Sequence, residues 1–325
     1  QAEDGIRDVE RSRGLGDVYK RQIFTFLFGL TVEKATKGEQ ALTIKDAYLI
    51  VTVGWVLITI FGAVPFYLAG TFGSFVDCIF ETASGFTTTG ASVLTNFNQP
   101  KGILFWRDFI HWIGGMGIIV LSIAILPTLG IGGMQIYRAE VPGPTPEKIK
   151  PRIRETAKVL WIVYTTISAV EVVALYLTGM SLFDSLCNMF GTMATGGFSP
   201  NPKSIGGYEN LTSEIIIIFF MFIAGSNFAL HYRFITGDLK AHLRDAEFKF
   251  YLFILLSAIA LITFNLRTGV YDSILTSLRY AAFQVVSITT TTGFVTADFA
   301  KWPVLSKMLL LTLMFIGAVS YTHLT

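Results

Sequence analysis

A threonine-glycine step occurs three times in this chain, each time after a short apolar stretch and between two longer hydrophobic segments. The steps are Thr89-Gly90, Thr195-Gly196 and Thr292-Gly293, and they lie about 100 residues apart. A chain that repeats such a unit at a regular period folds as a series of similar supersecondary structures. The repeat therefore limits the possible folds more than any other feature of the sequence.

The composition indicates an integral membrane protein. Hydrophobic residues make up 52% of the 325 residues and charged residues only 15%, which is unlike an ordinary soluble domain. The net charge of +2 is small and the basic residues are dispersed, so nucleic acid is not expected as a partner. Cys78 and Cys187 lie in apolar stretches and are too few for a disulfide framework or a thiolate metal site. We expect both to be small packing residues.

Apolar segments long enough to cross a bilayer flank each step. Ala47 to Gly70 carries no charge and would be about 36 Å long as a helix, against a hydrocarbon core of roughly 30 Å. Further spans are expected from near Gly102 to Leu126, Val159 to Leu177, Ile215 to Leu230, Phe250 to Leu266, and Val304 to Gly317. Ile23 to Leu30 resembles the end of an earlier helix.

The apolar stretch in front of each step is too short to span. Phe75 to Gly85 would be about 16 Å long as a helix, roughly half a bilayer, so the chain must turn back. Backbone at that depth is tolerated only where it is buried in protein or lines a watery cavity. Three such segments predict three contributions to one ion-conducting pore. The alternative, an amphipathic loop on the outer surface, is disfavoured by their repetition.

Alignment on the glycines Gly90, Gly196 and Gly293 supports the repeat. Ten residues before them stand Phe80, Leu186 and Phe283, and five residues before them stand Gly85, Gly191 and Ile288. The spacing is shared although the side chains differ.

Lysine and arginine predict the orientation in the membrane. The connections between repeats hold Arg138, Lys148, Lys150, Arg152 and Arg154 in one case, and Arg233, Lys240, Arg244 and Lys249 in the other. The segments that bear the steps hold only Lys101, Lys203, Arg279 and Lys301. By the positive-inside rule, the basic connections are cytoplasmic and the re-entrant loops enter from outside.

Threonine and glycine at these steps suit the coordination of a desolvated cation. Backbone carbonyls replace a hydration shell without adding fixed charge, and glycine adopts backbone angles that let successive carbonyls face one axis. A helix that ends at the loop directs its negative dipole end at the cation. The expected ion-binding residues are Thr88, Thr89, Gly90 and Ala91; Ala194, Thr195, Gly196 and Gly197; and Thr291, Thr292, Gly293 and Phe294.

Longer motifs around the steps resemble one family. The chain contains Phe80-Glu81-Thr82-Ala83-Ser84-Gly85-Phe86-Thr87-Thr88-Thr89-Gly90-Ala91, Trp112-Ile113-Gly114-Gly115-Met116-Gly117-Ile118 and Tyr137-Arg138-Ala139-Glu140-Val141-Pro142-Gly143-Pro144. Together with Pro151 to Ala157 and Asn227 to Leu230, these motifs closely resemble the Trk potassium-uptake proteins, the TrkH branch of the Trk/Ktr/HKT superfamily. The resemblance covers Ile23 to about Gly317.

The resemblance implies an all-α integral membrane fold, in which helix, pore loop, helix units surround one ion pathway with pseudo-fourfold symmetry. It implies a multi-pass protein of the bacterial inner membrane that takes up potassium, without enzymatic activity and without a cofactor. It further implies a homodimer gated by a cytoplasmic nucleotide-binding subunit of TrkA type. In this family a glycine in each filter segment accompanies a preference for potassium over sodium.

The chain departs from the family pattern at its end. Three of four filter segments are present, and the last helix breaks at Phe315-Ile316-Gly317, where the family has a glycine-rich gating loop. We therefore expect a fragment of a longer protein, with another Thr-Gly or Ser-Gly segment about 100 to 120 residues after Gly293 in the parent reading frame. Residues 1–22 and 318–325 resemble adaptor read-through; the alternative is a charged cytoplasmic helix and a natural terminus.

The predicted organisation follows from these boundaries. It comprises an adaptor-like tail at 1–22, the end of a helix and a cytoplasmic linker at 23–45, pore repeat 1 at 46–128, a cytoplasmic connection at 129–156, pore repeat 2 at 157–236, a second connection at 237–249, a truncated pore repeat 3 at 250–317, and a tail at 318–325.

Ionisable residues within apolar segments leave other mechanisms open. Arg107, Asp108 and His111 cluster at the start of a span, where an interfacial anchor is favoured over a proton relay. Glu171 lies deeper and either pairs with a basic group or binds an ion. A sodium- or proton-coupled symporter that uses Asp108 or Glu171 is the alternative to a channel. A membrane-embedded enzyme that uses His111 or His231 is disfavoured because no catalytic set clusters around them.

Overall fold

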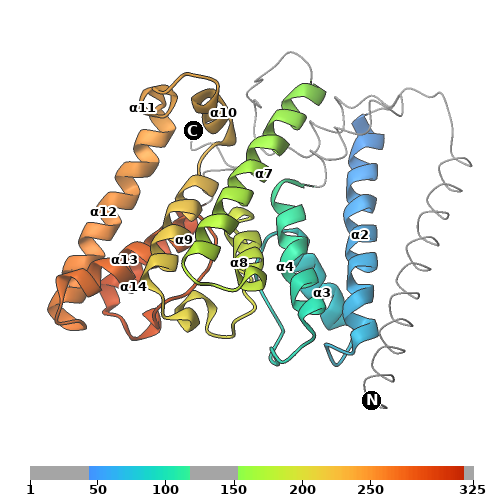
Figure 1. Ribbon diagram of the computed structural model, residues 1–325, viewed down its shortest axis with the longest axis horizontal. Coiled ribbons are helices and arrows are strands. Elements are labelled where there is room, and N and C mark those ends of the chain that lie inside the picture. The colour runs from blue at the N-terminus through green and yellow to red at the C-terminus, as the bar shows by residue number, and fades with distance from the viewer. Residues whose placement is uncertain (1–43, 118–152, 318–325) are drawn as a thin grey trace, which may run out of the picture. The chain divides into compact units, whose positions relative to one another are not determined.

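Three groups of helices form the part of the chain that the computed structural model describes, residues 44–117 and 153–317 (Figure 1). The first group is α2 (Ile44–Ala69), α3 (Phe75–Phe86) and α4 (Lys101–Gly115); the second is α7 (Ile153–Leu177), α8 (Leu182–Met193) and α9 (Leu211–Ala224); the third is α12 (Ala246–Gly269), α13 (Ile274–Thr289) and α14 (Val304–Ile316). The connections hold α10 (Phe228–Ile235), α11 (Ala241–Arg244), η2 (Ser204–Tyr208) and η3 (Phe299–Lys301). Within these ranges there is no β-strand, and the predicted all-α fold of repeated units is confirmed.

Several expected segments lie outside the described residues. They are the helix end at Ile23 to Leu30, the part of the second span beyond residue 117, the basic connection that contains Arg138, the motif from Tyr137 to Pro144, and the tails at 1–22 and 318–325. The described residues all belong to one compact unit.

The first helix of each group is long and apolar enough to cross a membrane. The candidate spans are Val51–Ala69, Lys158–Leu177 and Ala246–Gly269. These helices expose large apolar side chains, among them Phe61, Val173 and Phe264. Such a surface fits a hydrocarbon solvent, because side chains that face lipid need not be polar. The predicted multi-pass membrane protein is therefore supported by the length and the outward face of these helices.

The continuous span expected from Ile215 to Leu230 is wrong. The helix α9 ends at Ala224, and α10 begins only at Phe228. At the break, the hydroxyl of Ser226 donates a hydrogen bond to the carbonyl oxygen of Ile223 at 2.8 Å. A serine side chain that bonds the backbone in this way competes with the helical hydrogen bonds, which explains why the helix is interrupted there.

The half-length helices expected in front of the Thr-Gly steps are α3, α8 and α13. Ser74 caps α3 by accepting a hydrogen bond from the amide of Asp77, and Ser181 caps α8 by accepting one from the amide of Asp184. The serine satisfies a free N–H, and the aspartate places a negative charge at the positive end of the helix dipole. This Ser-x-x-Asp pattern accounts for where α3 and α8 begin.

The third helix of one group packs on the short helix of the next. The helix α4 contacts α8, and α9 contacts α13. A Cβ atom on Gly115 would lie 2.7 Å from the Cα atom of Ala194, and one on Gly225 would lie 2.5 Å from Cγ2 of Thr290. Small residues allow helices in membranes to approach this closely. The same contact therefore joins the first group to the second and the second to the third.

The second basic connection lies at one end of this unit. In Figure 1, α10 and α11 lie at the end where α7 and α12 begin, and the turns that join α2 to α3 and α12 to α13 lie at the opposite end. The basic residues of this connection therefore lie at the opposite end of α12 from the turn that leads into the short helix α13. They are Arg233, Lys240 and Arg244.

Candidate functional site

Each short helix ends in a loop with the same backbone pattern. A threonine with positive φ follows the helix: Thr88 at 54°, Thr195 at 52° and Thr291 at 58°. Two residues further on stands a glycine with positive φ: Gly90 at 74°, Gly197 at 75° and Gly293 at 79°. A left-handed threonine is uncommon and is retained only where the surroundings require it. Its occurrence at one position in all three loops shows that they are built alike.

This pattern corrects the alignment of the second loop by one residue. The structure pairs Gly90 and Gly293 with Gly197, whereas alignment of the Thr-Gly steps pairs them with Gly196. The hydrogen bonds that close the turns agree: the amides of Thr88, Thr195 and Thr291 donate to the carbonyls of Gly85, Thr192 and Ile288, respectively. Gly196 therefore occupies the position of Thr89 and Thr292, and the adjacent glycines misled the alignment.

Neighbouring loops touch where a glycine meets a carbonyl. A Cβ atom on Gly90 would overlap the carbonyl oxygen of Gly196, and a Cβ atom on Gly197 would overlap that of Thr292. The missing side chain is thus needed for close approach as well as for the backbone angle. The structure brings the first loop against the second and the second against the third. A Cβ on Gly293 would have no atom of the described residues within 4 Å.

Threonine hydroxyls brace the first and third loops. The Oγ1 atoms of Thr87 and Thr89 lie 2.8 Å apart, and so do those of Thr290 and Thr292. The first hydroxyl of each pair also donates to a carbonyl of the preceding helix turn. The threonines therefore stabilise the turn that carries the loop carbonyls.

The second loop is supported by a histidine from α4 instead. Where the other two loops have the paired threonines, the second loop has Ala194 and Gly196. A Cβ on Gly196 would lie 2.7 Å from Nδ1 of His111. The imidazole is fully buried and stacks on the ring of Phe198, with the ring centres 3.8 Å apart. His111 thus fills the space that a side chain at position 196 would take.

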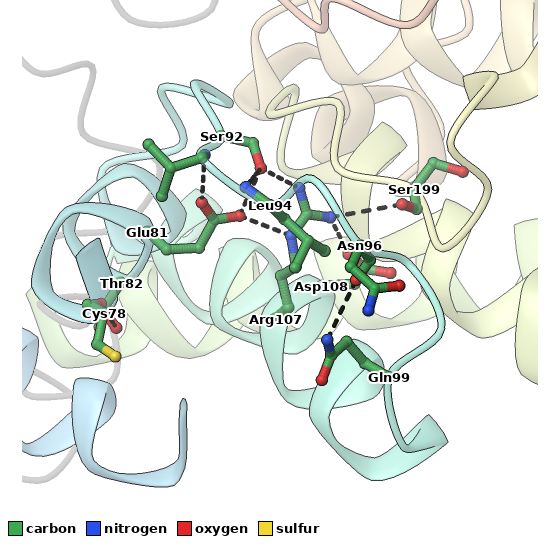
Figure 2. Close-up of polar contacts among 11 residues, drawn as sticks. Cys78, Glu81, Thr82, Ser92, Leu94, Asn96, Gln99, Arg107, Asp108 and Ser199 are labelled. Carbon is green, nitrogen blue, oxygen red and sulfur yellow. Dashed lines mark hydrogen bonds and ion pairs between the residues drawn. The ribbon is translucent and has the colours of Figure 1, made fainter. Parts of the chain in front are cut away.

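A buried ion pair lies behind the first loop (Figure 2). Nε of Arg107 donates to Oε1 of Glu81 at 2.7 Å, and Nη2 donates to Oγ of Ser92 at 3.0 Å. Glu81 also accepts hydrogen bonds from the Ser92 hydroxyl at 2.8 Å and from the amide of Val93 at 2.9 Å. The ion pair therefore holds the chain that follows Gly90 against α3.

The same guanidinium reaches the second loop. Nη1 of Arg107 donates to the carbonyl oxygen of Ser199 at 3.4 Å, and Cζ lies 3.6 Å from the centre of the Phe198 ring. Asp108 accepts a further hydrogen bond from Nη1 at 3.2 Å. The expectation that Arg107, Asp108 and His111 anchor a helix end among lipid headgroups is wrong. All three side chains are buried inside the protein, where Arg107 donates to Asp108 and His111 stacks on Phe198.

Glu81 has an equivalent in each repeat. In the corrected alignment, Asn188 and Gln284 stand at its position, and all three residues are fully buried. Oδ1 of Asn188 accepts a hydrogen bond from the hydroxyl of Ser199 at 2.9 Å, as Glu81 does from Ser92. These residues were missed from the sequence. The signal that could have found them is a polar residue at one position of three apolar half-helices.

The third repeat lacks this bond, and its loop is held differently. Val295 stands where the other loops have serine, and neither polar atom of Gln284 has a hydrogen-bond partner among the described residues. The amide of Val295 donates to Oγ of Ser204 at 3.2 Å, and the amide of Gly206 donates to the Val295 carbonyl at 3.0 Å. At residue 295 the support therefore comes from η2 and the residue that precedes it, while on α13 the hydroxyl of Ser287 donates to the carbonyl oxygen of Phe294 at 2.7 Å.

The other candidate groups do not join the loops. Glu171 on α7 is fully buried, and neither carboxylate oxygen has a hydrogen-bond partner within the described ranges. His231 lies 2.9 Å from the Ser226 hydroxyl and 3.2 Å from a ring nitrogen of His242. Among the residues described, there is no cluster of three potential metal ligands. Cys78 and Cys187 are buried free cysteines, in keeping with a packing role.

Fold and site together define a multi-pass helical membrane protein whose repeats bring carbonyl-bearing loops side by side. The family model described as "Cation transport protein", TrkH, matches residues 17–322. The chain belongs to the TrkH family. The match begins and ends inside the segments interpreted as adaptor-like tails, an interpretation that stays a prediction.

Curated relatives and a solved structure agree with this family. The chain is 44% identical over 286 residues to the Trk system potassium uptake protein TrkH of Salmonella typhimurium, covering 86% of this chain and 59% of the relative. It is 36% identical to TrkG of Escherichia coli, covering 84% and 57%, respectively. The crystal structure of the potassium transporter TrkH from Vibrio parahaemolyticus matches with a TM-score of 0.74 and 38% identity, covering 87% of this chain and 58% of that one. The chain thus spans less than two thirds of the length of these relatives.

Proposed function

We propose that these residues form three filter segments of a potassium-uptake transporter. The observation that carries the proposal is the contact between glycine and carbonyl that recurs from Gly90 to Gly196 and from Gly197 to Thr292. It brings adjacent loops into backbone contact at the ends of short helices, which supports a ring of loop carbonyls that can replace the hydration shell of a cation. In the corrected alignment the equivalent segments are Thr88 to Ala91, Thr195 to Phe198 and Thr291 to Phe294, so Phe198 joins the filter and Ala194 leaves it.

The complete filter requires a fourth segment beside Gly293. Each of the first two glycines contacts a carbonyl of the next loop, and the corresponding position at Gly293 is open among the described residues. The relatives are longer than this chain, and they bear Trk system potassium-uptake names. We place the full-length protein in the bacterial inner membrane as a homodimer gated by a TrkA-type cytoplasmic subunit, as the family resemblance implies.

Channel-like translocation is favoured over symport, with two buried carboxylates as observations for the alternative. Oδ1 of Asp108 accepts a hydrogen bond from Arg107, and its buried Oδ2 has no hydrogen-bond partner among the described residues. Glu171 is buried with neither carboxylate oxygen hydrogen-bonded within the described residues. A proton-coupled mechanism would operate through one of these two residues.

Potassium flux in liposomes tests both points on the full-length protein that contains this chain. We expect flux that does not depend on a sodium or proton gradient and that Glu171→Gln leaves unchanged. Flux that follows the proton gradient and is lost in Glu171→Gln would establish the symporter instead.

The filter assignment is tested by Gly90→Ser, which forces a side chain onto the Gly196 carbonyl and onto a left-handed backbone. We expect it to lower the potassium-to-sodium flux ratio. Gly54→Ser on α2 is the matched control, because no atom lies within 4 Å of a Cβ at that position. An unchanged ratio in Gly90→Ser would refute the filter.

A further inference from the structure

One guanidinium joins equivalent points of two loops. Ser92 follows Gly90 by the same interval as Ser199 follows Gly197, and Arg107 donates to the hydroxyl of the first serine and to the carbonyl oxygen of the second. A lysine ammonium has its donors on one nitrogen, whereas the planar fork of arginine directs donors toward separate acceptors. The geometry therefore depends on arginine and not on positive charge alone.

Both carboxylate oxygens of Glu81 accept hydrogen bonds. Oε1 accepts from Arg107 and Ser92, and Oε2 accepts from the amide of Val93. A buried ion pair is costly to desolvate, and an apolar pair of similar volume is often as stable. The ion pair between Arg107 and Glu81 therefore acts by orienting the loops, since charge-assisted hydrogen bonds hold their partners in a defined geometry.

The arrangement belongs to the first repeat. Arg107 stands on α4, which begins after Pro100; at the same distance from the start of α9 and α14 stand Ile217 and Leu310. Both are buried apolar residues in the core. The other repeats therefore have no equivalent arginine at this position, and an arginine links only the first and second loops.

We propose that Arg107, held in place by Glu81, is a positioning residue that sets the spacing between the first two filter segments and thereby the preference for potassium over sodium. The proposal rests on the proposed function, because it assumes that these loops coordinate the ion. Sodium is the smaller cation, so a filter whose segments can approach one another more closely would coordinate it better. Loss of the link is expected to raise sodium flux more than it lowers potassium flux.

The test uses Arg107→Lys in the full-length protein, reconstituted in liposomes, with potassium and sodium flux measured separately. Lysine keeps the charge beside Glu81 and cannot reach both serines. We expect the potassium-to-sodium ratio to fall by about tenfold, equivalent to about 1.4 kcal/mol. Ser92→Ala is a milder second variant that keeps the ion pair and the bond from the Val93 amide to Glu81, and removes the hydroxyl through which Arg107 contacts the first loop. It should lower the ratio to a smaller extent, and it remains informative if Arg107→Lys fails to fold.

Arg279→Lys is the matched control. Arg279 on α13 forms a two-pronged ion pair with Glu214 on α9, with distances of 2.6 and 2.7 Å, and neither residue hydrogen-bonds a filter loop. We expect this variant to lose thermal stability while keeping its flux ratio.

Three results would overturn the proposal. Unchanged ratios in both Arg107→Lys and Ser92→Ala, in a wild-type protein that prefers potassium, would show that Arg107 is merely structural. An equal fall of the ratio in Arg279→Lys would assign the effect to general destabilisation. A wild-type protein without any preference would refute the proposed function itself, and the role of Arg107 with it.

Discussion

Gly196 and Gly197 are adjacent in the second loop and are required for different reasons. Gly197 has a φ of 75°, and a Cβ there would overlap the carbonyl oxygen of Thr292. Gly196 is not among the residues with positive φ, and its Cβ would meet the ring of His111. The backbone thus requires glycine at position 197, whereas the neighbouring His111 side chain requires it at position 196. Only the requirement at position 196 can be relieved by changing another residue.

Gly196→Ala is therefore expected to destabilise the full-length protein by about 1–3 kcal/mol, the usual range for overpacking. In the Gly196→Ala/His111→Ala double variant, the added methyl group occupies space that the ring has left. We expect a favourable coupling of about 1 kcal/mol in a double-mutant cycle based on thermal unfolding. Gly197→Ala is the control, because removing His111 does not relieve its contact with Thr292. Additive effects of Gly196→Ala and His111→Ala would contradict this view of the contact.

At the scale of elements, the three short helices carry a polar residue at one equivalent point. In α3 and α8 this residue, Glu81 or Asn188, accepts a hydrogen bond from the serine that follows the loop glycine. In α13 the residue is Gln284, and Val295 replaces the serine. A buried amide without a partner costs free energy, because it loses its hydrogen bonds to water. Among the three short helices, α13 is therefore the one whose equivalent polar residue lacks a hydrogen bond within the described residues.

Val295→Ser is expected to supply the missing donor to Gln284. Val295→Ala is the matched control, since both substitutions remove the valine methyl groups and only serine adds a hydroxyl. We expect the serine variant to be more stable than the alanine variant by about 1 kcal/mol, the net worth of one hydrogen bond. Chemical or thermal unfolding of the two purified proteins measures the difference. Equal stabilities would mean that Gln284 does not face residue 295.

At the scale of the whole molecule, the same contacts join one repeat to the next. The third helix of a repeat packs on the short helix of the following repeat, and a loop glycine meets the following loop's carbonyl. These contacts run from the first repeat to the second and from the second to the third. Gly293 stands at the equivalent position of the third loop, where a Cβ would meet no atom of the described residues within 4 Å.

In the full-length protein we expect Gly293→Ala to impair potassium flux as strongly as Gly90→Ala. A fourth loop would place a carbonyl against Gly293, just as the second loop does against Gly90. Backbone strain alone, at a φ of 79°, would cost on the order of 1–3 kcal/mol. Potassium flux and thermal stability of the two variants, compared with Gly54→Ala on α2, provide the measurement. A Gly293→Ala variant with normal flux would show that no segment closes the ring at that position.

Much of the architecture could be predicted from the sequence. The hydropathy of α2, α7 and α12, the half-length of α3 and α8, and the repetition of the unit are sums over neighbouring residues, which a sequence displays directly. The threonines and glycines of the loops were found in the same way. The expected helix from Ile215 to Leu230 was wrong because its interruption depends on the hydrogen bond of one side chain, that of Ser226.

The sequence by itself determined that this is a helical membrane protein with repeated pore loops, because hydropathy and period are local properties of a chain. The tertiary structure alone decided which glycine of the second loop matches the others, that Arg107 and His111 are buried behind the loops, and that Glu81 has equivalents in the other repeats. Each of these depends on backbone angles or on contacts between residues far apart in the chain. No local pattern records such contacts, because they arise only when separate repeats pack together.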